Sequence, residues 1–178
     1  MKLLQHIVTL LIIVGGLFLV IAFVLPKEFT VKRQTEIKTA PNVVYQKLLD
    51  LKTRAEWDPR VEKDAAASIT VLAKSGPVNS SWMWEGEKIG AGKLTIKQVA
   101  ENKAVWIRID VTKPVMTVYE SYWKIDPVQE GTMVTWTIKG PLTYPLERYR
   151  GLVIDRTLGS ECARGLELLK IACERSAP

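Results

Sequence analysis

The sequence predicts an α+β fold: an antiparallel sheet covered by one long C-terminal helix, preceded by a separate apolar N-terminal helix. Three observations support this. Residues 7–25 carry no charge, apolar and polar side chains alternate with a two-residue period through much of 29–139, and apolar residues recur at helical spacing over 158–173. The 178 residues suffice for one anchor and one domain, predicted as 1–26 and 27–178.

The first apolar segment has the length of a membrane-spanning helix. Residues 7–25 are nineteen consecutive uncharged residues, and a helix of that length covers roughly 28 Å, close to the hydrocarbon thickness of a bilayer. A secretory signal peptide has a shorter apolar core and ends in small residues, whereas this run ends in bulky residues followed by Pro26. We therefore expect an uncleaved, single-pass membrane anchor.

The charges around the anchor bear on its orientation and on its partners. Lys2 precedes it, and four basic residues follow it closely, namely Lys27, Lys32, Arg33 and Lys38. This count favours the cytoplasmic side of a bacterial inner membrane for the domain, although a long domain can be translocated despite such charges. Basic residues here favour anionic lipid headgroups. The net charge is +6, but no Lys/Arg block or nucleic-acid motif is present, so no nucleic-acid partner is expected.

The elements that follow the anchor are predicted from period and from chain breakers. Residues 29–37 alternate as a strand, Pro41 opens a helix that runs to about Leu51, and Asp58-Pro59 ends that region in a turn or a short second helix. Further strands, mostly separated by short turns, are predicted at 69–73, 80–85, 92–99, 104–111, 115–125 and 132–139. This pattern is typical of an antiparallel meander.

The last predicted element is a long amphipathic helix, with an apolar stripe at Leu158, Cys162, Leu166, Leu169 and Cys173. The two cysteines are eleven residues apart, roughly 16 Å along a helix axis, so they are expected as buried free thiols rather than as a disulfide. Gly159 and Gly165 each cost about 1 kcal/mol relative to alanine in a helix interior. Close packing against the sheet is one reason for them, and room for a bound ligand is the other.

Several short motifs occur in a characteristic order. They are Trp57-Asp58-Pro59, Trp82-Met83-Trp84-Glu85-Gly86, Gly90-Ala91-Gly92, Gly131 through Trp136, and Gly165 through Lys170. In this order the chain resembles the START-like (SRPBCC) superfamily over residues 28–174, specifically its polyketide cyclase/dehydrase-like branch with an N-terminal transmembrane segment. The resemblance implies the START/Bet v 1-like helix-grip fold, a curved sheet around a long C-terminal helix with an apolar cavity between them. It implies no reaction, because such domains bind lipids, sterols or polyketides.

The sequence offers little for catalysis. Its only histidine, His6, lies at the start of the anchor, so the predicted domain lacks the base of histidine-dependent nucleophilic sites and the usual zinc ligand. Gly90-Ala91-Gly92 lies between two predicted strands, as in a hairpin, without the helix that a phosphate-binding loop requires. We expect no metal and no cofactor and assign no catalytic residue, which leaves enzymatic activity open and favours its absence.

Alternation predicts an interior rich in aromatic side chains. Four of the six tryptophans fall on the more apolar face of their strands. Such rings either form a solid core or line a concave apolar pocket with a few polar groups. The predicted cavity-lining residues are Trp82, Trp84, Ile107, Thr117, Tyr119, Ser121, Trp123, Trp136, Leu158 and Cys162.

Two charged residues are candidates for orienting a ligand. Arg33 has the inward parity of the first strand, where it needs an acidic partner or a ligand anion unless its head group reaches water at the sheet edge. Asp155, near the predicted start of the final helix, either reaches the pocket mouth or forms a solvated pair with Arg156.

These observations give one leading function and two alternatives. We expect a membrane-anchored START-like domain that binds a hydrophobic small molecule or a lipid in an apolar cavity. The first alternative is a polyketide cyclase/dehydrase-like enzyme acting on an apolar substrate, and the absence of histidine counts against it. The second is a non-catalytic protein-interaction module at the membrane, supported by Trp106 on the predicted outer face. The sequence indicates neither the ligand nor the oligomeric state.

Overall fold

The computed structural model describes residues 2–175 and confirms the predicted fold class. Residue 1, at the start of the predicted anchor, lies outside the described residues, and so do residues 176–178 at the end of the predicted domain. The helical elements are α1 (Lys2–Val24), α2 (Pro41–Leu49), a 3-10 turn η1 (Arg54–Glu56), α3 (Pro59–Lys63) and α4 (Leu146–Arg175). The strands are β1 (Glu28–Ile37), β2 (Ser68–Leu72), β3 (Ser81–Gly86), β4 (Gly90–Ala100), β5 (Ala104–Lys113), β6 (Thr117–Val128) and β7 (Gly131–Pro141).

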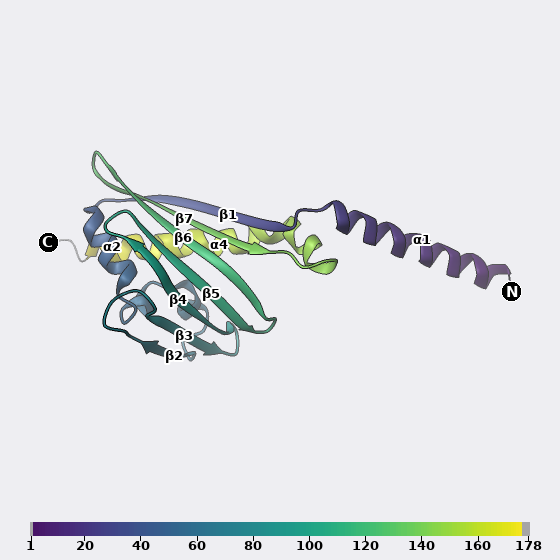
Figure 1. Cartoon of the computed structure of the whole chain (residues 1–178), viewed down its shortest axis with the longest axis horizontal. Helices are drawn as coiled ribbons and strands as arrows, with labels where there is room; N and C mark the ends of the chain where they lie inside the picture. Colours follow the sequence, from purple (N-terminus) through teal and green to yellow (C-terminus); the bar gives the residue numbers. More distant parts are fainter. Residues whose placement is uncertain (1, 176–178) are drawn as a thin grey trace.

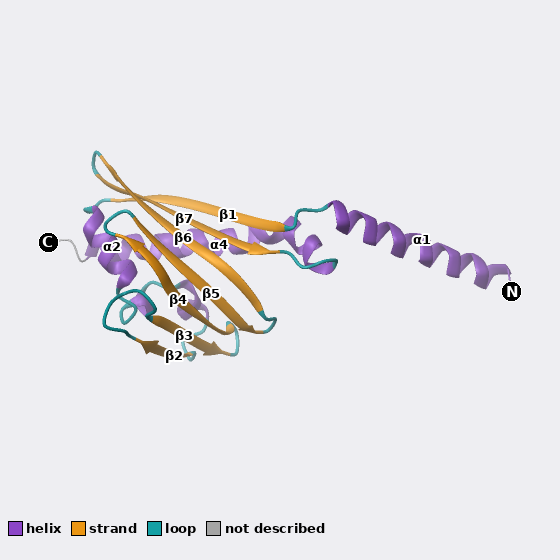
Figure 2. Ribbon diagram, in the orientation of Figure 1, coloured by secondary structure: helices purple, strands orange, loops and turns teal. Residues whose placement is uncertain are grey.

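The strands form one antiparallel sheet in the order β1-β7-β6-β5-β4-β3-β2. Strands β2 to β7 are a meander, and β1 returns to pair with β7. Helix α4 lies across one face of this sheet (Figure 2), and its contacts are mainly with β1. The predicted strands are confirmed to within a few residues. One difference is that β6 runs through Asp126-Pro127, which the sequence predicts as a turn, because the reversal occurs just before Gly131, whose φ of 148° suits glycine.

Alternation correctly predicts the inner face of the sheet. Trp82, Trp84, Trp123 and Trp136 are all buried beneath α4 and the short helices. The rings of Trp123 and Trp136 stack with their centroids 4.2 Å apart, and Trp57 meets Trp123 edge-on at 6.0 Å. Indole rings therefore fill a large part of the space between the sheet and its covering helix.

Two glycines allow α4 to approach the sheet closely. A Cβ at Gly159 would lie 2.0 Å from Nη2 of Arg33, and a Cβ at Gly165 would lie 2.8 Å from the Trp136 ring and 3.3 Å from Pro59. These distances are too short for any side chain unless the neighbours move. They confirm the close-packing interpretation of both glycines.

The final helix is longer than its apolar stripe suggests. It begins at Leu146, so Asp155 lies in its interior and not near its start, which corrects the expectation from the sequence. The stripe begins late because the first turns of α4 are next to α1 and carry exposed apolar residues, among them Leu146 and Leu152. Cys162 and Cys173 are both buried and free, as predicted.

Within residues 2–175, α1 is the one helix long and apolar enough to cross a membrane. Of its side chains only Ala22 is buried. The helix leads away from the domain at the end where β1 and α4 begin, so the long axes of domain and helix nearly continue each other (Figure 1).

The tight contact at Gly165 predicts a large stability difference between two valine substitutions on α4. Gly165→Val would force three carbon atoms against the rigid indole of Trp136 and lower the free energy of unfolding by about 1–3 kcal/mol. The matched control, Ala163→Val, is at an exposed position of the same helix and should cost less than about 1 kcal/mol. Thermal unfolding in detergent measures both, and equal effects would contradict the proposed contact.

Candidate functional site

A cavity of about 320 Å³ lies between the inner face of the sheet and α4. Its walls come from α3, the β3–β4 hairpin, strands β5 to β7 and the middle of α4. The lining residues are Asp58, Pro59, Arg60, Lys63, Trp84, Lys88, Ile89, Ile109, Val111, Lys113, Pro114, Tyr119, Trp136, Ile138, Leu158, Glu161 and Cys162. Most of this surface is apolar, and the charged residues come from α3, α4 and the hairpin ends.

Half of the predicted cavity residues line this space. They are Trp84, Tyr119, Trp136, Leu158 and Cys162, which come from four different elements. Tyr119 is the most exposed aromatic ring of the group and meets Phe29 edge-on at 5.5 Å. Strand parity and the helical stripe thus direct these five side chains towards one shared space.

The other predicted lining residues lie elsewhere. Trp82 and Trp123 are completely buried in the core, and Thr117, the first residue of β6, is not in the lining. Ile107 and Ser121 are buried inner-face residues that border a hollow on the opposite side of the sheet.

Ser121 has a defined structural role. Its Oγ accepts a hydrogen bond of 2.8 Å from Nε1 of Trp136, and both residues are buried. A buried indole N–H without a partner is costly, so this hydroxyl fixes the orientation of a ring that belongs to the cavity wall. The sequence predicts Ser121 as a ligand contact, whereas the structure places it behind the wall.

Four basic residues line the cavity and were not predicted. They are Arg60, Lys63, Lys88 and Lys113, and they face only two acidic lining residues, Asp58 and Glu161. Lys63 pairs with Glu161, and Lys113 pairs with Glu85 at 2.6 Å. The ammonium group of Lys88 has no ion-pair partner among the described residues. These residues belong to α3 and to hairpin ends, where strand alternation does not predict which way a side chain points.

A buried cluster of charges adjoins the cavity. The carboxylate of Asp58 pairs with Arg54 at 2.9 Å and with Arg60 at 2.8 Å, and it also accepts the backbone N–H of Arg60 as the N-cap of α3. The guanidinium groups lie over indole rings: Arg54 is 4.5 Å from the centroid of Trp57, and Arg60 is 4.1 Å from that of Trp84. The Trp57-Asp58-Pro59 motif is therefore the centre of a packed ionic core.

Burial and pairing fix the protonation of these groups. Burial alone would raise the pKa of Asp58, but the adjacent charges of Arg60 and Arg54 outweigh burial and hold that pKa well below its ordinary value of 3.8. Burial lowers the pKa of Arg54 to about 10, which leaves it charged at neutral pH. Burial also raises the pKa of the Cys162 thiol to about 12, so this cavity residue is protonated at neutral pH.

Arg33 and Asp155 lie together, away from the cavity. Nη1 of Arg33 donates to Oδ1 of Asp155 at 3.0 Å, and Nη2 donates to Oδ2 at 3.1 Å, in a bidentate pair across the β1–α4 contact. Their hydrogen bond raises the pKa of Arg33 and lowers that of Asp155. Neither residue is in the lining, and their visible role is to join α4 to the edge strand.

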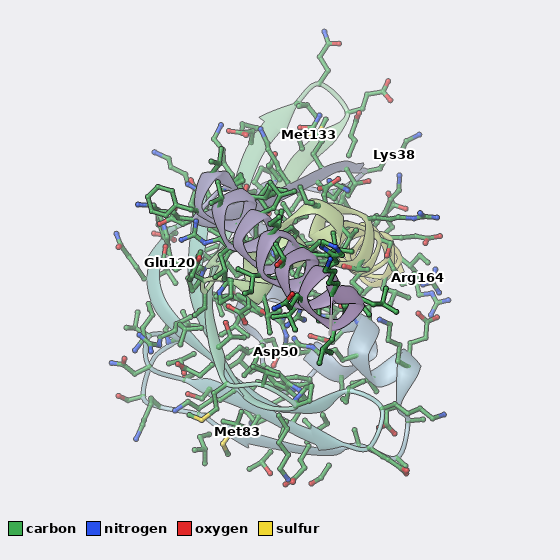
Figure 3. The ribbon with its side chains drawn as sticks, turned by 90° about the vertical axis from the view of Figure 1, so that its right-hand side faces the viewer. Lys38, Asp50, Met83, Glu120, Met133 and Arg164 are labelled. Atoms are coloured by element: carbon green, nitrogen blue, oxygen red, sulfur yellow. The ribbon has the colours of Figure 1, made fainter. Side chains whose placement is uncertain are left out.

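A second, larger hollow of about 650 Å³ lies on the outer face of the sheet. Trp106 and Tyr122 pack against each other there with centroids 4.9 Å apart, beside Arg108 and Glu120. Figure 3, viewed from the α1 end, shows Glu120 on this outer side. The inner cavity is the better candidate despite its smaller volume, because its walls are core elements and its lining is mainly apolar with few polar groups.

The described part of the chain contains no group of three or more histidine, cysteine or acidic side chains that could hold a metal ion. The residues that line the cavity present apolar surface, four cationic groups, the carboxylates of Asp58 and Glu161, and one protonated thiol.

Comparison with known families gives one match that spans the domain. Residues 28–174 match the model of the family described as polyketide cyclase / dehydrase and lipid transport. No curated protein sequence matches the chain.

Solved structures with the same fold are numerous. Protein CV1439 of Chromobacterium violaceum has a TM-score of 0.62 at 14% identity over 82% of this chain and 96% of its own. TTHA0849 of Thermus thermophilus has a TM-score of 0.60 at 19% identity over 84% and 99%. The di-domain ARO/CYC StfQ of the steffimycin biosynthetic pathway has a TM-score of 0.66 at 12% identity over 84% and 51%. At such identities these likenesses establish the fold.

The ionic core predicts that neutralising Asp58 is far more damaging than neutralising an exposed carboxylate. Asp58→Asn would leave Arg54 and Arg60 buried without a counter-ion and lower the free energy of unfolding by about 3–5 kcal/mol. The control is Glu62→Gln, which breaks an exposed pair with Arg164 and should change stability little. Urea titrations compare them, and a mild effect of Asp58→Asn would argue against the cluster.

The same carboxylate predicts a dependence of stability on pH. Because the pKa of Asp58 is lower in the folded than in the unfolded chain, its contribution is complete above about pH 4 and is lost as the pH falls towards the folded value. Unfolding free energies measured between neutral and acidic pH should fall more steeply for the wild type than for Asp58→Asn. Parallel curves would contradict this assignment.

Proposed function

Because the chain belongs to the polyketide cyclase / dehydrase and lipid transport family, we propose that it is a membrane-anchored binding protein that holds a hydrophobic small molecule or a lipid between its sheet and α4. The observation that carries this proposal is the apolar cavity walled by Trp84, Trp136 and Leu158, whose charged residues come from α3, α4 and the hairpin ends. A solid core would leave no such cavity between the sheet and α4.

The size of the cavity suits a modest ligand. A volume of about 320 Å³ is near the lower end of the range for small-molecule sites, which suits a single acyl chain or a small ring system. Each methylene that leaves water for such a space gains about 0.8 kcal/mol. Apolar burial is thus the main source of affinity in this proposal.

The basic lining residues suggest what the polar end of the ligand looks like. Lys63 and Lys113 already have acidic partners, and Arg60 is held by Asp58, whereas the ammonium group of Lys88 is uncommitted among residues 2–175. A carboxylate or phosphate on the ligand would complete this charge. The preferred ligand is therefore amphipathic and anionic.

The anchor in this proposal is α1. Its length and apolar composition support a single membrane crossing by residues 1–26, which would tether a domain of residues 27–178 beside the bilayer. The excess of basic residues after the helix supports the cytoplasmic side for the domain. A tethered binding domain would meet its ligand at or near the membrane.

A substitution that fills the cavity with a larger side chain should abolish ligand binding. The full chain is purified in detergent, exposed to a bacterial lipid extract, washed, and analysed for retained molecules by mass spectrometry. Leu158→Trp places a bulky indole ring in the cavity and should abolish retention, whereas Ile171→Trp, on an exposed face of the same helix, should retain as much as the wild type. Absence of any retained molecule in the wild type would defeat the proposal.

The preference for an anionic head can be tested separately. A fluorescent fatty acid should bind more tightly than its methyl ester, and Lys88→Gln should remove most of that difference. Lys93→Gln, on the exposed outer face of β4, is the control and should leave it unchanged. If the acid and the ester bound equally well to the wild type, the cavity would select for shape alone.

A further inference from the structure

The cavity lies near the end of the sheet from which α1 departs. Strand β7 ends at Pro141, which pairs with Glu28 at the start of β1, and Lys139 pairs with Glu120 of β6. Residues of β6 before Glu120 therefore continue towards that end, and the β5–β6 turn at residues 114–116 lies there. Figure 1 shows this turn on the same side of the domain as α1 and the start of α4.

Helix α1 and the first turns of α4 are joined by specific contacts. The hydroxyl of Tyr149 donates to the carbonyl oxygen of Phe18 at 2.6 Å, and the two rings stack 4.5 Å apart. The hydroxyl of Tyr144 donates to the carbonyl oxygen of Leu19 at 3.2 Å. Arg148 completes the contact by donating from Nη1 to the carbonyl oxygen of Leu25 at 2.8 Å.

These contacts fix a depth relative to the anchor. Phe18 is six residues before Val24, the last residue of α1, which corresponds to about 9 Å along the helix axis. The tyrosine hydroxyls thus contact α1 well before its last residue and not only at its end. If α1 crosses a bilayer, the start of α4 lies within the headgroup region, where tyrosine is the preferred kind of side chain.

The same end of the domain exposes large apolar side chains to solvent. On α4, Leu146 is 68% exposed, Leu152 66% and Val153 57%, and on the β5–β6 turn Met116 is 81% exposed and Val115 52%. Single exposed apolar residues are ordinary, but a group of them at one end of a domain is typical of an interaction surface. We call these five residues the apolar end.

Charges around the apolar end suit a lipid surface. Lys27 and Arg150 are largely exposed beside it, Arg150 at 4.0 Å from Glu147, and Lys113, which pairs with the exposed Glu85, adjoins the β5–β6 turn. Glu28 is exposed nearby, whereas Glu147 is mostly covered because it accepts the backbone N–H of Thr143. Cations at a membrane surface are attracted to anionic headgroups.

We infer that the apolar end is a second membrane contact, inserted into the lipid interface beside α1, and that ligand passes between the bilayer and the cavity at the β5–β6 turn. Lys113 and Pro114 line the cavity and directly precede Val115 and Met116 of the apolar end, so the cavity wall and the lipid-facing surface adjoin along the chain. This inference rests on the proposed role of α1 as an anchor and of the cavity as a ligand site. Its occupant is the bilayer that holds α1, rather than a second protein.

Depth-dependent quenching in vesicles tests the contact. The full chain is reconstituted in phosphatidylcholine vesicles containing a quarter of phosphatidylglycerol, with an environment-sensitive dye on one introduced cysteine. Cys162 and Cys173 should stay unlabelled, because burial raises their pKa values to about 12 and about 11. The unsubstituted chain is treated in parallel to confirm this.

The expected result is a contrast between two ends of one helix. A dye at Leu152→Cys should shift to the blue and be quenched by lipids that carry a spin label close to the headgroup. A dye at Ile171→Cys, an exposed apolar position near the other end of α4, should remain in water. Quenching at both positions, or a blue shift at Leu152 without quenching by lipid, would overturn the inference, the latter in favour of a protein partner.

A third labelled position separates this inference from the proposed anchor. A dye at Val14→Cys, in the middle of α1, should be quenched by lipids labelled deep in the acyl chain. If Val14 is quenched and Leu152 is not, the anchor stands and the second contact fails. If Val14 is not quenched, the anchor itself fails.

The route of the ligand has its own measurement. Energy transfer from tryptophan to a fluorescent fatty acid reports loading of the cavity, because Trp84 and Trp136 are in its wall. Met116→Glu should slow loading from vesicles several-fold while equilibrium binding in detergent is unchanged. Met133→Glu, at the opposite end of the sheet, is the matched control and should alter neither. Equal loading rates for the two variants would rule out entry at the β5–β6 turn.

Discussion

The packing of Trp136 against α4 is the contact on which both the core and the cavity depend. One face of the ring stacks on Trp123 in the core, and the ring edge meets the backbone of α4 at Gly165. The same side chain is part of the cavity wall, and Ser121 fixes its orientation by a hydrogen bond. Because protein interiors are close-packed, the position of this ring determines how much space is left beneath Leu158.

The ionic core beside the indoles explains why the cavity has a polar side at all. Asp58 pairs with two arginines and caps α3, and Arg60 lies over the ring of Trp84. A buried ion pair contributes little net stability compared with apolar packing, but it tolerates few alternative arrangements. It therefore holds α3, and with it Arg60 and Lys63, at one definite place on the cavity wall.

Sequence periodicity locates the faces of the sheet and of α4 but not the depth of each residue beneath them. Trp82 and Trp84 have the same parity on the same strand, yet Trp82 belongs to the core and Trp84 to the cavity wall. Which of the two a residue becomes depends on whether other elements pack against it, and periodicity does not show that. Lys88 and Lys113 are at hairpin ends, where no periodicity predicts the direction of a side chain. The burial of Arg54 follows only from its tertiary contact with Asp58. The meeting of β1 with α4, and of α1 with the first turns of α4, likewise depends on tertiary structure alone.

The balance between binding and catalysis follows from the state of the buried groups. A general base near the cavity needs a pKa close to neutral, but Asp58 is held ionised by two arginines, and the Cys162 thiol is held protonated by burial. Neither group therefore has a pKa suited to proton transfer at neutral pH. A cyclase or dehydrase reaction would have to use other side chains of the lining. A cavity whose buried ionisable groups do not change state is suited to holding a molecule unchanged and releasing it, as the proposed binding function requires.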